Sequence, residues 1–255
     1  MIGARLSSAE RQIGSGQDYA ICGTAYGIPY AAVMDGHGSD QCIDFVRSLN
    51  FDDVMTSPDP AIFLHNLIKG SGDTFKSGFT FTCARVVDDI RVQVWNVGDS
   101  ETHVFGKNGE HIYKTPTHTF SNNDELERTR ALCVVNPVFA PFPISSTRIE
   151  NILSPVGVFH TGENLALSMA YGHNNMTGFN PSFWEMDVNG PFRIVCGSDG
   201  LHDMLVELTG SADEMVDEAA RRWQMDWMYF DGKTTSMANY AGGYDDVSVA
   251  VIEIA

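Results

Sequence analysis

The sequence has 255 residues, of which 43% are hydrophobic, enough to build the core of one large domain or two small ones. Lysine and arginine total 16 and aspartate and glutamate total 33, which gives a formal charge of −17. An acidic surface of this strength repels phosphate backbones, so we expect no nucleic-acid partner. A phosphorylated substrate would be repelled as well, unless bound cations reversed the sign of the field locally.

The five cysteines are scattered, with no closely spaced pair, which is typical of reduced thiols rather than of a disulfide framework or a zinc site. The N-terminal residues lack the apolar segment of a signal peptide, and the longest apolar stretch is too short to span a bilayer. We therefore expect a soluble, cytoplasmic monomer without membrane contact. The absence of repeats and of linker composition favours a single domain over residues 1–255.

The predicted strands come in runs whose members are separated by two to four residues, as at Gly27-Ile28-Pro29 and Asp88-Asp89. Connections this short force antiparallel hairpins, because a parallel crossover needs a dozen residues or more. Helical spacing of apolar residues appears between these runs. In chain order, we predict strands over Tyr19–Tyr26 and Tyr30–Met34, helices over Cys42–Leu49 and Ala61–Ile68, strands over Phe79–Val87, Ile90–Val97 and His103–Phe105, a helix over Asn123–Leu132, a strand over Phe192–Cys196, a helix over Ala212–Trp223 and a strand over Val247–Ile254.

Start signals support two of the helices. Asp59 and Pro60 precede the helix that starts at Ala61, and Ser211 is a suitable N-cap for the helix over Ala212–Trp223. Two segments rich in Thr, Asn, Pro and Gly, Thr115–Asn122 and Gly172–Gly190, are predicted to be long loops, the second a substrate-facing flap. Hairpins alternating with helices favour an α+β fold in which helices cover antiparallel sheets.

Four apolar, strand-like runs are each bounded by an aspartate that lies next to glycine or to another aspartate. Three of the runs end at this aspartate, and the fourth begins just after it. The runs AAVMDGHG, QVWNVGDS and RIVCGSDG end at Asp35, Asp99 and Asp199, and Asp245-Asp246 stands just before VSVAVIEI. Each one alone is typical of an ordinary turn. Four carboxylates brought to one sheet edge require a counter-charge, and oxygen ligands select hard ions such as Mg²⁺ or Mn²⁺. The residues therefore predict a metal site.

The ordered set VMDGHGSD, SGFTFTCARV, VWNVGDSETHVF, LALSMAYG, IVCGSDGLHDML and YDDVSVAVI resembles the metal-dependent protein phosphatases of type 2C and spans nearly the whole chain. The resemblance implies an α-β-β-α sandwich of two antiparallel β-sheets flanked by helix pairs. It also implies two Mg²⁺ or Mn²⁺ ions that activate water to hydrolyse phosphoserine and phosphothreonine in phosphoprotein substrates.

The resemblance further implies roles for individual residues. Asp35 matches the bridging carboxylate and Gly36 the residue whose carbonyl joins the coordination shell. Asp199 and Asp245 match the terminal carboxylates of the first metal, and His37 matches the general acid. Asp99 matches a position that supports structure more than it binds metal.

The chain departs from the family pattern at several positions. Gln17-Asp18 stands where an acidic pair contacts the second metal, usually through water, and Asp246 replaces a usual Asn, so these three are candidates for indirect or weak metal contact. The usual phosphate-gripping Arg is missing; Arg11 or Arg5 is the substitute, and we assign Arg11. Thr117-His118 replaces the Asp-His of a third metal site, which leaves that site in doubt.

These departures leave a second hypothesis, a catalytically impaired pseudophosphatase that acts as a regulatory or binding module. The intact set Asp35, Gly36, His37, Asp199 and Asp245 favours the active enzyme. Other histidines, among them His103, His111 and His160, are interpreted as surface or packing residues, because none lies beside an acid cluster.

Overall fold

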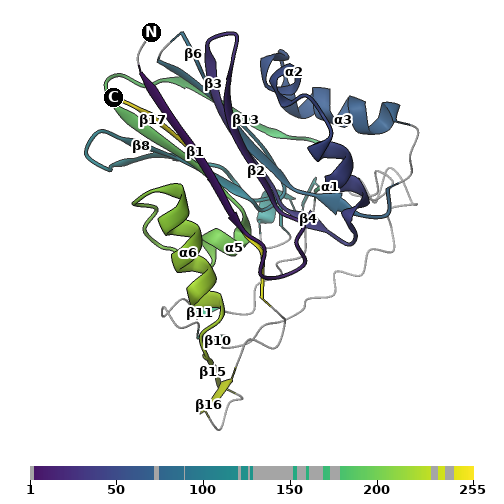
Figure 1. The fold of residues 1–255 in the computed structure, drawn as a ribbon, viewed down its shortest axis with the longest axis vertical. Coiled ribbons are helices and arrows are strands. Elements are labelled where there is room, and N and C mark those ends of the chain that lie inside the picture. Colours follow the sequence, from purple (N-terminus) through teal and green to yellow (C-terminus); the bar gives the residue numbers. More distant parts are fainter. Residues whose placement is uncertain are drawn as a thin grey trace.

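Two antiparallel sheets stacked face to face form the centre of the molecule in a computed structural model, with helices on both outer faces (Figure 1). The structure describes residues 3–71, 75–88, 90–119, 122–125, 127–128, 152–153, 159–160, 169–172, 179–230, 235–238 and 244–255. The two ends of the described chain lie side by side, because the first strand pairs with the last one along their whole lengths.

Each main sheet has five strands. The first has the order β1 (Ala4–Arg11), β17 (Val247–Ile254), β14 (Phe192–Gly197), β8 (Glu101–Gly106) and β9 (His111–Lys114). The second has the order β13 (Ser182–Asp187), β7 (Arg91–Val97), β6 (Phe81–Val87), β3 (Ile28–Met34) and β2 (Tyr19–Ala25). Hairpins β2–β3 and β6–β7 lie within the second sheet, as their short connections predict.

The space between the sheets is filled by small and branched side chains. Ala31 and Val33 of β3 pack there with Ile194 of β14 and Ala250 and Ile252 of β17, all of them buried. Side chains of a strand alternate between its two faces, so the same strands also supply the outer cores under the helices. Cys83 of β6, for example, packs in the cluster that the first three helices cover.

Three helices cover the outer face of the second sheet and two cover the first (Figure 1). Asp59 caps one helix through a bond from the Ile62 amide, and Ser211 and Glu214 form a complete capping box at another. The helices are α1 (Asp40–Arg47), α2 (Phe51–Thr56) and α3 (Pro60–Gly70) over the second sheet, and α5 (Asp199–His202) and α6 (Ala212–Trp223) over the first.

Short strands complete the structure and form two small sheets. One has the order β12 (Tyr171–Gly172), β5 (Gly78–Phe79) and β4 (Gly36–His37). The other has the order β11 (Phe159–His160), β10 (Ile152–Leu153), β15 (Trp227–Phe230) and β16 (Thr235–Ala238).

The predicted α-β-β-α sandwich is confirmed, and the helix over Ala212–Trp223 has the predicted bounds. The helix predicted over Asn123–Leu132 is helical at residues 123–125 and 127–128, and its remainder lies outside the described residues. The prediction of one long loop over Gly172–Gly190 is wrong, because β13 pairs with β7 along that segment; residues 173–178 lie outside the described part. Strand β1 was not predicted.

No helix among the described residues is long and apolar enough to cross a membrane.

Candidate metal centre

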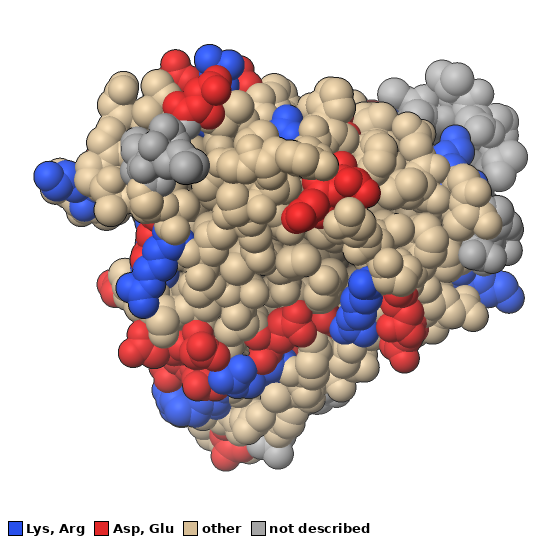
Figure 2. Space-filling model, turned by 45° about the horizontal axis from the view of Figure 1, so that its top comes forward, with Lys and Arg blue, Asp and Glu red and all other residues tan. Residues whose placement is uncertain are grey.

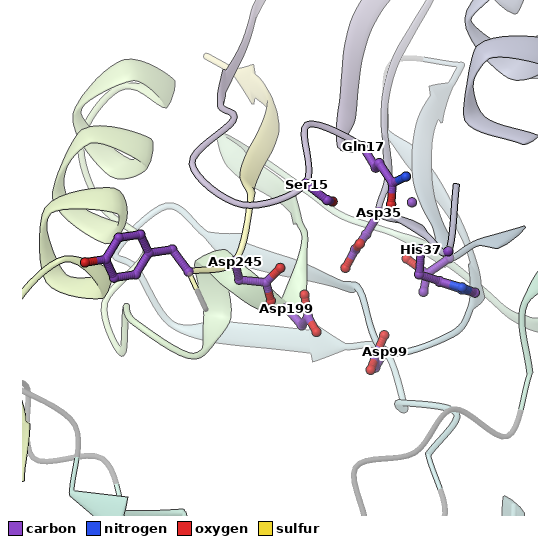
Figure 3. A pocket seen from close by; sticks show the side chains of 11 residues that line it. Ser15, Gln17, Asp35, His37, Asp99, Asp199 and Asp245 are labelled. Atoms are coloured by element: carbon purple, nitrogen blue, oxygen red, sulfur yellow. The ribbon is translucent and has the colours of Figure 1, made fainter. Parts of the chain in front are cut away.

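A cavity of about 440 Å³ lies where β3, β14 and β17 come together with the loop after β7, and carboxylates from four separate segments enter it (Figure 3). Asp35, Asp199 and Asp245 point toward one another in this view, with Asp99 close to Asp199. The cavity is lined by Ser15, Gln17, Asp35, Gly36, His37, Gly38, Thr80, Asp99, Asp199, Tyr244 and Asp245.

Strand β3 and the small sheet that contains β4 and β5 position Asp35, Gly36 and His37. Asp35 comes directly after β3, and its carbonyl accepts a bond from the Thr80 amide at 2.8 Å. Gly36 and His37 then pair with β5, which fixes the backbone at the cavity wall. A Cβ atom at Gly36 would meet the backbone carbonyl oxygen of Gln17 at 2.5 Å, so only glycine permits this approach.

Asp199 and Asp245 are brought together by neighbouring strands of the first sheet. Asp199 opens helix α5 after β14, and Asp245 lies two residues before β17, which pairs with β14. Ser198 ties the two segments, because its amide donates to the Ser248 carbonyl at 3.1 Å and its Oγ accepts from the Ser248 amide at 3.0 Å. The predicted pair of acids therefore shares one wall of the cavity.

Asp99 joins this group, although the sequence assigned it a supporting role. One carboxylate oxygen each from Asp35, Asp99 and Asp199 lie within 4.8 Å of one another. Gly98 precedes it with a φ of 106°, and a Cβ atom there would collide with Thr80. The sequence contained a signal for this position, since Asp99 ends a strand-like run as Asp35 and Asp199 do. The distances from Asp99 to those two acids were not predictable from it.

Burial and mutual repulsion dominate the electrostatics of the cavity. Burial raises the pKa of Asp35 and of Asp99 well above the usual value, and repulsion from Asp199 adds to both shifts. Burial raises the pKa of Asp245 to about 10, and repulsion from the carboxylates of Asp199 and Asp18 adds to the shift. Asp203, one turn beyond Asp199, has a raised pKa as well and was missed from the sequence.

The residues present fit a site for hard divalent cations. No lysine or arginine is among the described residues that line the cavity, so the side chains there supply no fixed positive charge. Asp18 Oδ2 is buried without a hydrogen-bond partner among the described residues. A set of oxygen donors with an excess of buried negative charge is what Mg²⁺ and Mn²⁺ require.

The three candidates for weak metal contact have different environments. Asp246 is turned to the loop before β2, where its carboxylate accepts bonds from the amides of Gly14, Gly16 and Gln17 at 2.6, 2.5 and 3.0 Å. Gln17 lines the cavity and donates its Nε2 to Asp40 at 2.8 Å. Asp18 is buried, and its carboxylate is repelled by those of Asp199 and Asp246.

Arg11 does not lie at the cavity. Its Nε is 2.6 Å from Asp217 and its Nη2 3.5 Å from Asp213, both on α6. The structure therefore does not support Arg11 as the phosphate contact, because two acids of α6, unforeseeable from spacing alone, hold the guanidinium at another surface.

His111 is exposed, as a surface histidine is expected to be, but the premise that His103 lies away from acids is wrong. His103 Nε2 lies 2.9 Å from Glu101 Oε2, and its Nδ1 lies 3.1 Å from His111 Nε2. The side chain of His160 lies outside the described residues.

A search of protein-family models gives no match to this chain. Among curated proteins, the chain is similar to a probable protein phosphatase 2C 52 of Oryza sativa subsp. japonica, with 23% identity over 246 residues. The alignment covers 87% of this chain and 43% of the rice protein, so the chain spans less than half the length of that relative.

Solved structures give the same result for the fold. A C. elegans sex-determining protein matches with a TM-score of 0.65 and 17% identity over 98% of this chain and 65% of that one. The S. agalactiae serine/threonine phosphatase matches with a TM-score of 0.61 and 17% identity over 99% of this chain and 100% of that one. The catalytic domain of the serine/threonine protein phosphatase PstP, in complex with two manganese ions, matches with a TM-score of 0.53 and 16% identity over 99% of each chain.

The comparisons agree on the fold of this chain. The chain has the fold of the metal-dependent protein phosphatases, and the resemblance to type 2C that its motifs indicated is confirmed.

Proposed function

We propose that this protein hydrolyses phosphoserine and phosphothreonine in proteins with the help of bound Mg²⁺ or Mn²⁺. The observation that carries the proposal is the convergence of Asp35, Asp99, Asp199 and Asp245 on one cavity whose described lining has no basic side chain except His37. The similarity to the rice protein and the manganese complex of PstP support both the reaction and the ions.

Asp35, Asp199 and Asp245, with the carbonyl of Gly36, would hold the two cations, and Asp99 would add a further carboxylate beside Asp35 and Asp199. Divalent cations at such a site neutralise the approaching phosphate and lower the pKa of a bound water to make it a nucleophile. The carboxylates would hold the cations at fixed positions, because strands β3, β14 and β17 fix the backbones that carry them.

His37 is our candidate for the group that moves a proton. It lines the cavity at its edge, and Figure 3 shows its imidazole directed away from Asp245. From this position a protonated ring would donate to the departing serine or threonine oxygen, a contribution of about 10²–10⁴-fold in general acid catalysis.

The remaining features of the proposal follow from sequence and charge. We infer a phosphoprotein partner, no nucleic-acid or membrane partner, a cytoplasmic monomer and a single domain over residues 1–255. The formal charge of −17 argues against a nucleic-acid partner. Figure 2 shows acidic side chains at several places on one face, with basic ones between them.

Hydrolysis of p-nitrophenyl phosphate and of a phosphothreonine peptide tests the proposal. We expect activity with Mn²⁺, none with EDTA, and a loss of more than about 100-fold in Asp199→Asn, since even indirect partners of a metal contribute about 10–100-fold. Asp226→Asn, an exposed acid outside the cavity, is the matched control and should keep full activity.

The second hypothesis is a pseudophosphatase, and the position of Arg11 favours it, because no arginine is among the described residues that line the cavity. The same assay separates the two. A folded protein that binds Mn²⁺ but hydrolyses neither substrate would support the pseudophosphatase and contradict the enzyme.

A further inference from the structure

A second group of metal-ligating side chains lies outside the carboxylate cavity. Glu101 and His103 are on β8, and His202 is on α5, which packs against the same sheet. Their side chains are mostly buried, with exposed fractions of 11%, 14% and 10%. None of the three lines the carboxylate cavity.

The spacing of their ligand atoms suits one metal ion. Glu101 Oε2 lies 2.9 Å from His103 Nε2 and 3.9 Å from His202 Nδ1, and the ligand atoms of the three residues all lie within 4.8 Å of one another. Ligands at 2.0–2.1 Å from a tetrahedral zinc ion are separated by about 3.3 Å, which is close to the distances between these ligand atoms. The rings of His103 and His202 stack at 4.9 Å with 24° between their planes, so at least one ring has to rotate to direct its nitrogen at a shared ion.

The outer nitrogens of both imidazoles meet acceptors. His202 Nε2 lies 3.3 Å from the backbone carbonyl of Glu101, which can only accept, so Nε2 carries a hydrogen. In the neutral ring Nδ1 is then the ligand atom, and it lies 3.9 Å from Glu101 Oε2. His103 Nδ1 lies 3.1 Å from His111 Nε2, which can accept its hydrogen. Metal-binding histidines typically donate their second N–H in this way.

An ion pair alone explains only part of this arrangement. Lys114 Nζ lies 2.8 Å from Glu101 Oε2 and neutralises it, and a protonated His103 ring can donate to the same oxygen. Neither contact involves His202 Nδ1, which in a neutral ring offers a lone pair 3.9 Å from Glu101 Oε2. The Lys114 side chain is 47% exposed, so it can leave the oxygen for solvent.

We propose that Glu101, His103 and His202 bind one Zn²⁺ or a similar borderline transition ion, with a fourth position left for water. Two imidazoles and one carboxylate form a donor set that zinc uses, whereas the carboxylates of the cavity suit Mg²⁺ and Mn²⁺. The ion would fasten β8 to α5, the helix that begins with Asp199. This site is independent of the proposed phosphatase reaction.

Zinc titration of the full chain, with excess Mg²⁺ present to occupy the carboxylate cavity, tests the site. We expect one tightly bound Zn²⁺ whose X-ray absorption spectrum contains the outer-shell scattering of two imidazoles. His103→Gln should abolish tight binding, and His111→Ala should weaken it by about 10–100-fold, as loss of an outer hydrogen-bond partner does. His65→Gln, a histidine on α3 that stacks on Phe179, is the matched control and should bind as the unaltered chain does.

Lys114→Ala keeps the test informative if the histidine variants do not fold. The Lys114 ammonium group competes with zinc for the Glu101 carboxylate. Its removal should increase zinc affinity, because zinc then displaces no cation from Glu101. A spectrum with oxygen ligands only, or equal affinity in Lys114→Ala and in the unaltered chain, would overturn the proposal. Because none of the readouts is hydrolysis, failure of the phosphatase reaction would not affect the result.

Discussion

At the scale of single residues, the two neighbouring acids just before strand β17 have different roles. Asp245 faces the cavity, whereas Asp246 accepts bonds from three backbone amides of the loop before β2 and one from Ser15 Oγ at 3.1 Å. Hydrogen bonds to a charged acceptor stabilise more than neutral ones. Asp246 therefore holds the loop that carries Ser15 and Gln17 to the cavity.

Replacement of this acid by its amide tests that role. In Asp246→Asn, the new NH₂ group would face an amide that also donates, so we expect the free energy of unfolding in urea to fall by about 1–3 kcal/mol. Asp226→Asn should change it by less than about 0.5 kcal/mol, as exposed substitutions do. Equal stability of both variants would show that other contacts hold the loop.

His37 gives a second prediction at this scale. In His37→Ala, turnover of a phosphothreonine peptide should fall by about 10²–10⁴-fold, because its alkoxide leaving group needs a proton. Turnover of p-nitrophenyl phosphate should fall much less, because nitrophenolate leaves without one. Steady-state kinetics on both substrates measures the difference, and an equal loss on both would contradict the general-acid role.

At the scale of elements, helices α5 and α6 form one unit against the first sheet. Trp223 at the end of α6 donates its Nε1 to the Gly200 carbonyl at 2.7 Å, in a buried position beside Asp199. Leu201 of α5 packs in the same cluster as Met215 and Val216 of α6. The long helix therefore supports the short one that carries a carboxylate of the cavity.

The N-cap of α6 measures how much this helix contributes. Ser211 accepts from the Glu214 amide, and Glu214 accepts in return from the Ser211 amide at 2.8 Å. Ser211→Ala removes the hydroxyl half of the box, and we expect a loss of about 0.5–2 kcal/mol in urea unfolding. Ser211→Thr keeps a hydroxyl and should lose less; an identical loss in both variants would contradict the cap as the cause.

At the scale of the whole molecule, buried negative charge links stability to pH and to divalent ions. Burial raises the pKa of Asp18 to about 8, with repulsion from Asp199 and Asp246 adding to it, and burial and Asp199 raise that of Asp203 to about 8. In the unfolded chain these groups titrate near the ordinary value of 3.8. Between these limits the folded protein binds more protons than the unfolded one.

Without divalent ions, the folded protein should be most stable near pH 4, close to the pKa of aspartate in the unfolded chain. Its free energy of unfolding should fall as pH rises from about 4 to about 8, by about 1.4 kcal/mol per pH unit for each of Asp18 and Asp203. Thermal unfolding in EDTA at pH 6 and pH 8 measures this difference. Excess Mg²⁺ should raise the melting temperature, most strongly at pH 8, because cations bind the ionised carboxylates.

General repulsion among surface acids would also favour lower pH, and salt separates the two causes. In about 1 M NaCl the Debye length is about 3 Å, so surface repulsion is screened while buried carboxylates are affected much less. A pH dependence that disappears in this salt would contradict the buried acids as its source.

The sequence by itself determined the hairpins of the second sheet, the bounds of α6 and the strand ends at which the acids stand. Periodicity and capping act over a few residues, so local patterns contain them. It did not predict β1 or β13, which lie at sheet edges; β13 has the mixed sequence SFWEMD and pairs on one side only.

Only the tertiary structure decided which polar groups meet. In the folded chain Asp99 lies close to Asp35 and Asp199, and His103 lies close to Glu101 and His202. Arg11 pairs with acids of α6. The physical reason is that charge and metal ligation depend on distances of a few ångströms between side chains far apart in the chain, and strand pairing sets those distances.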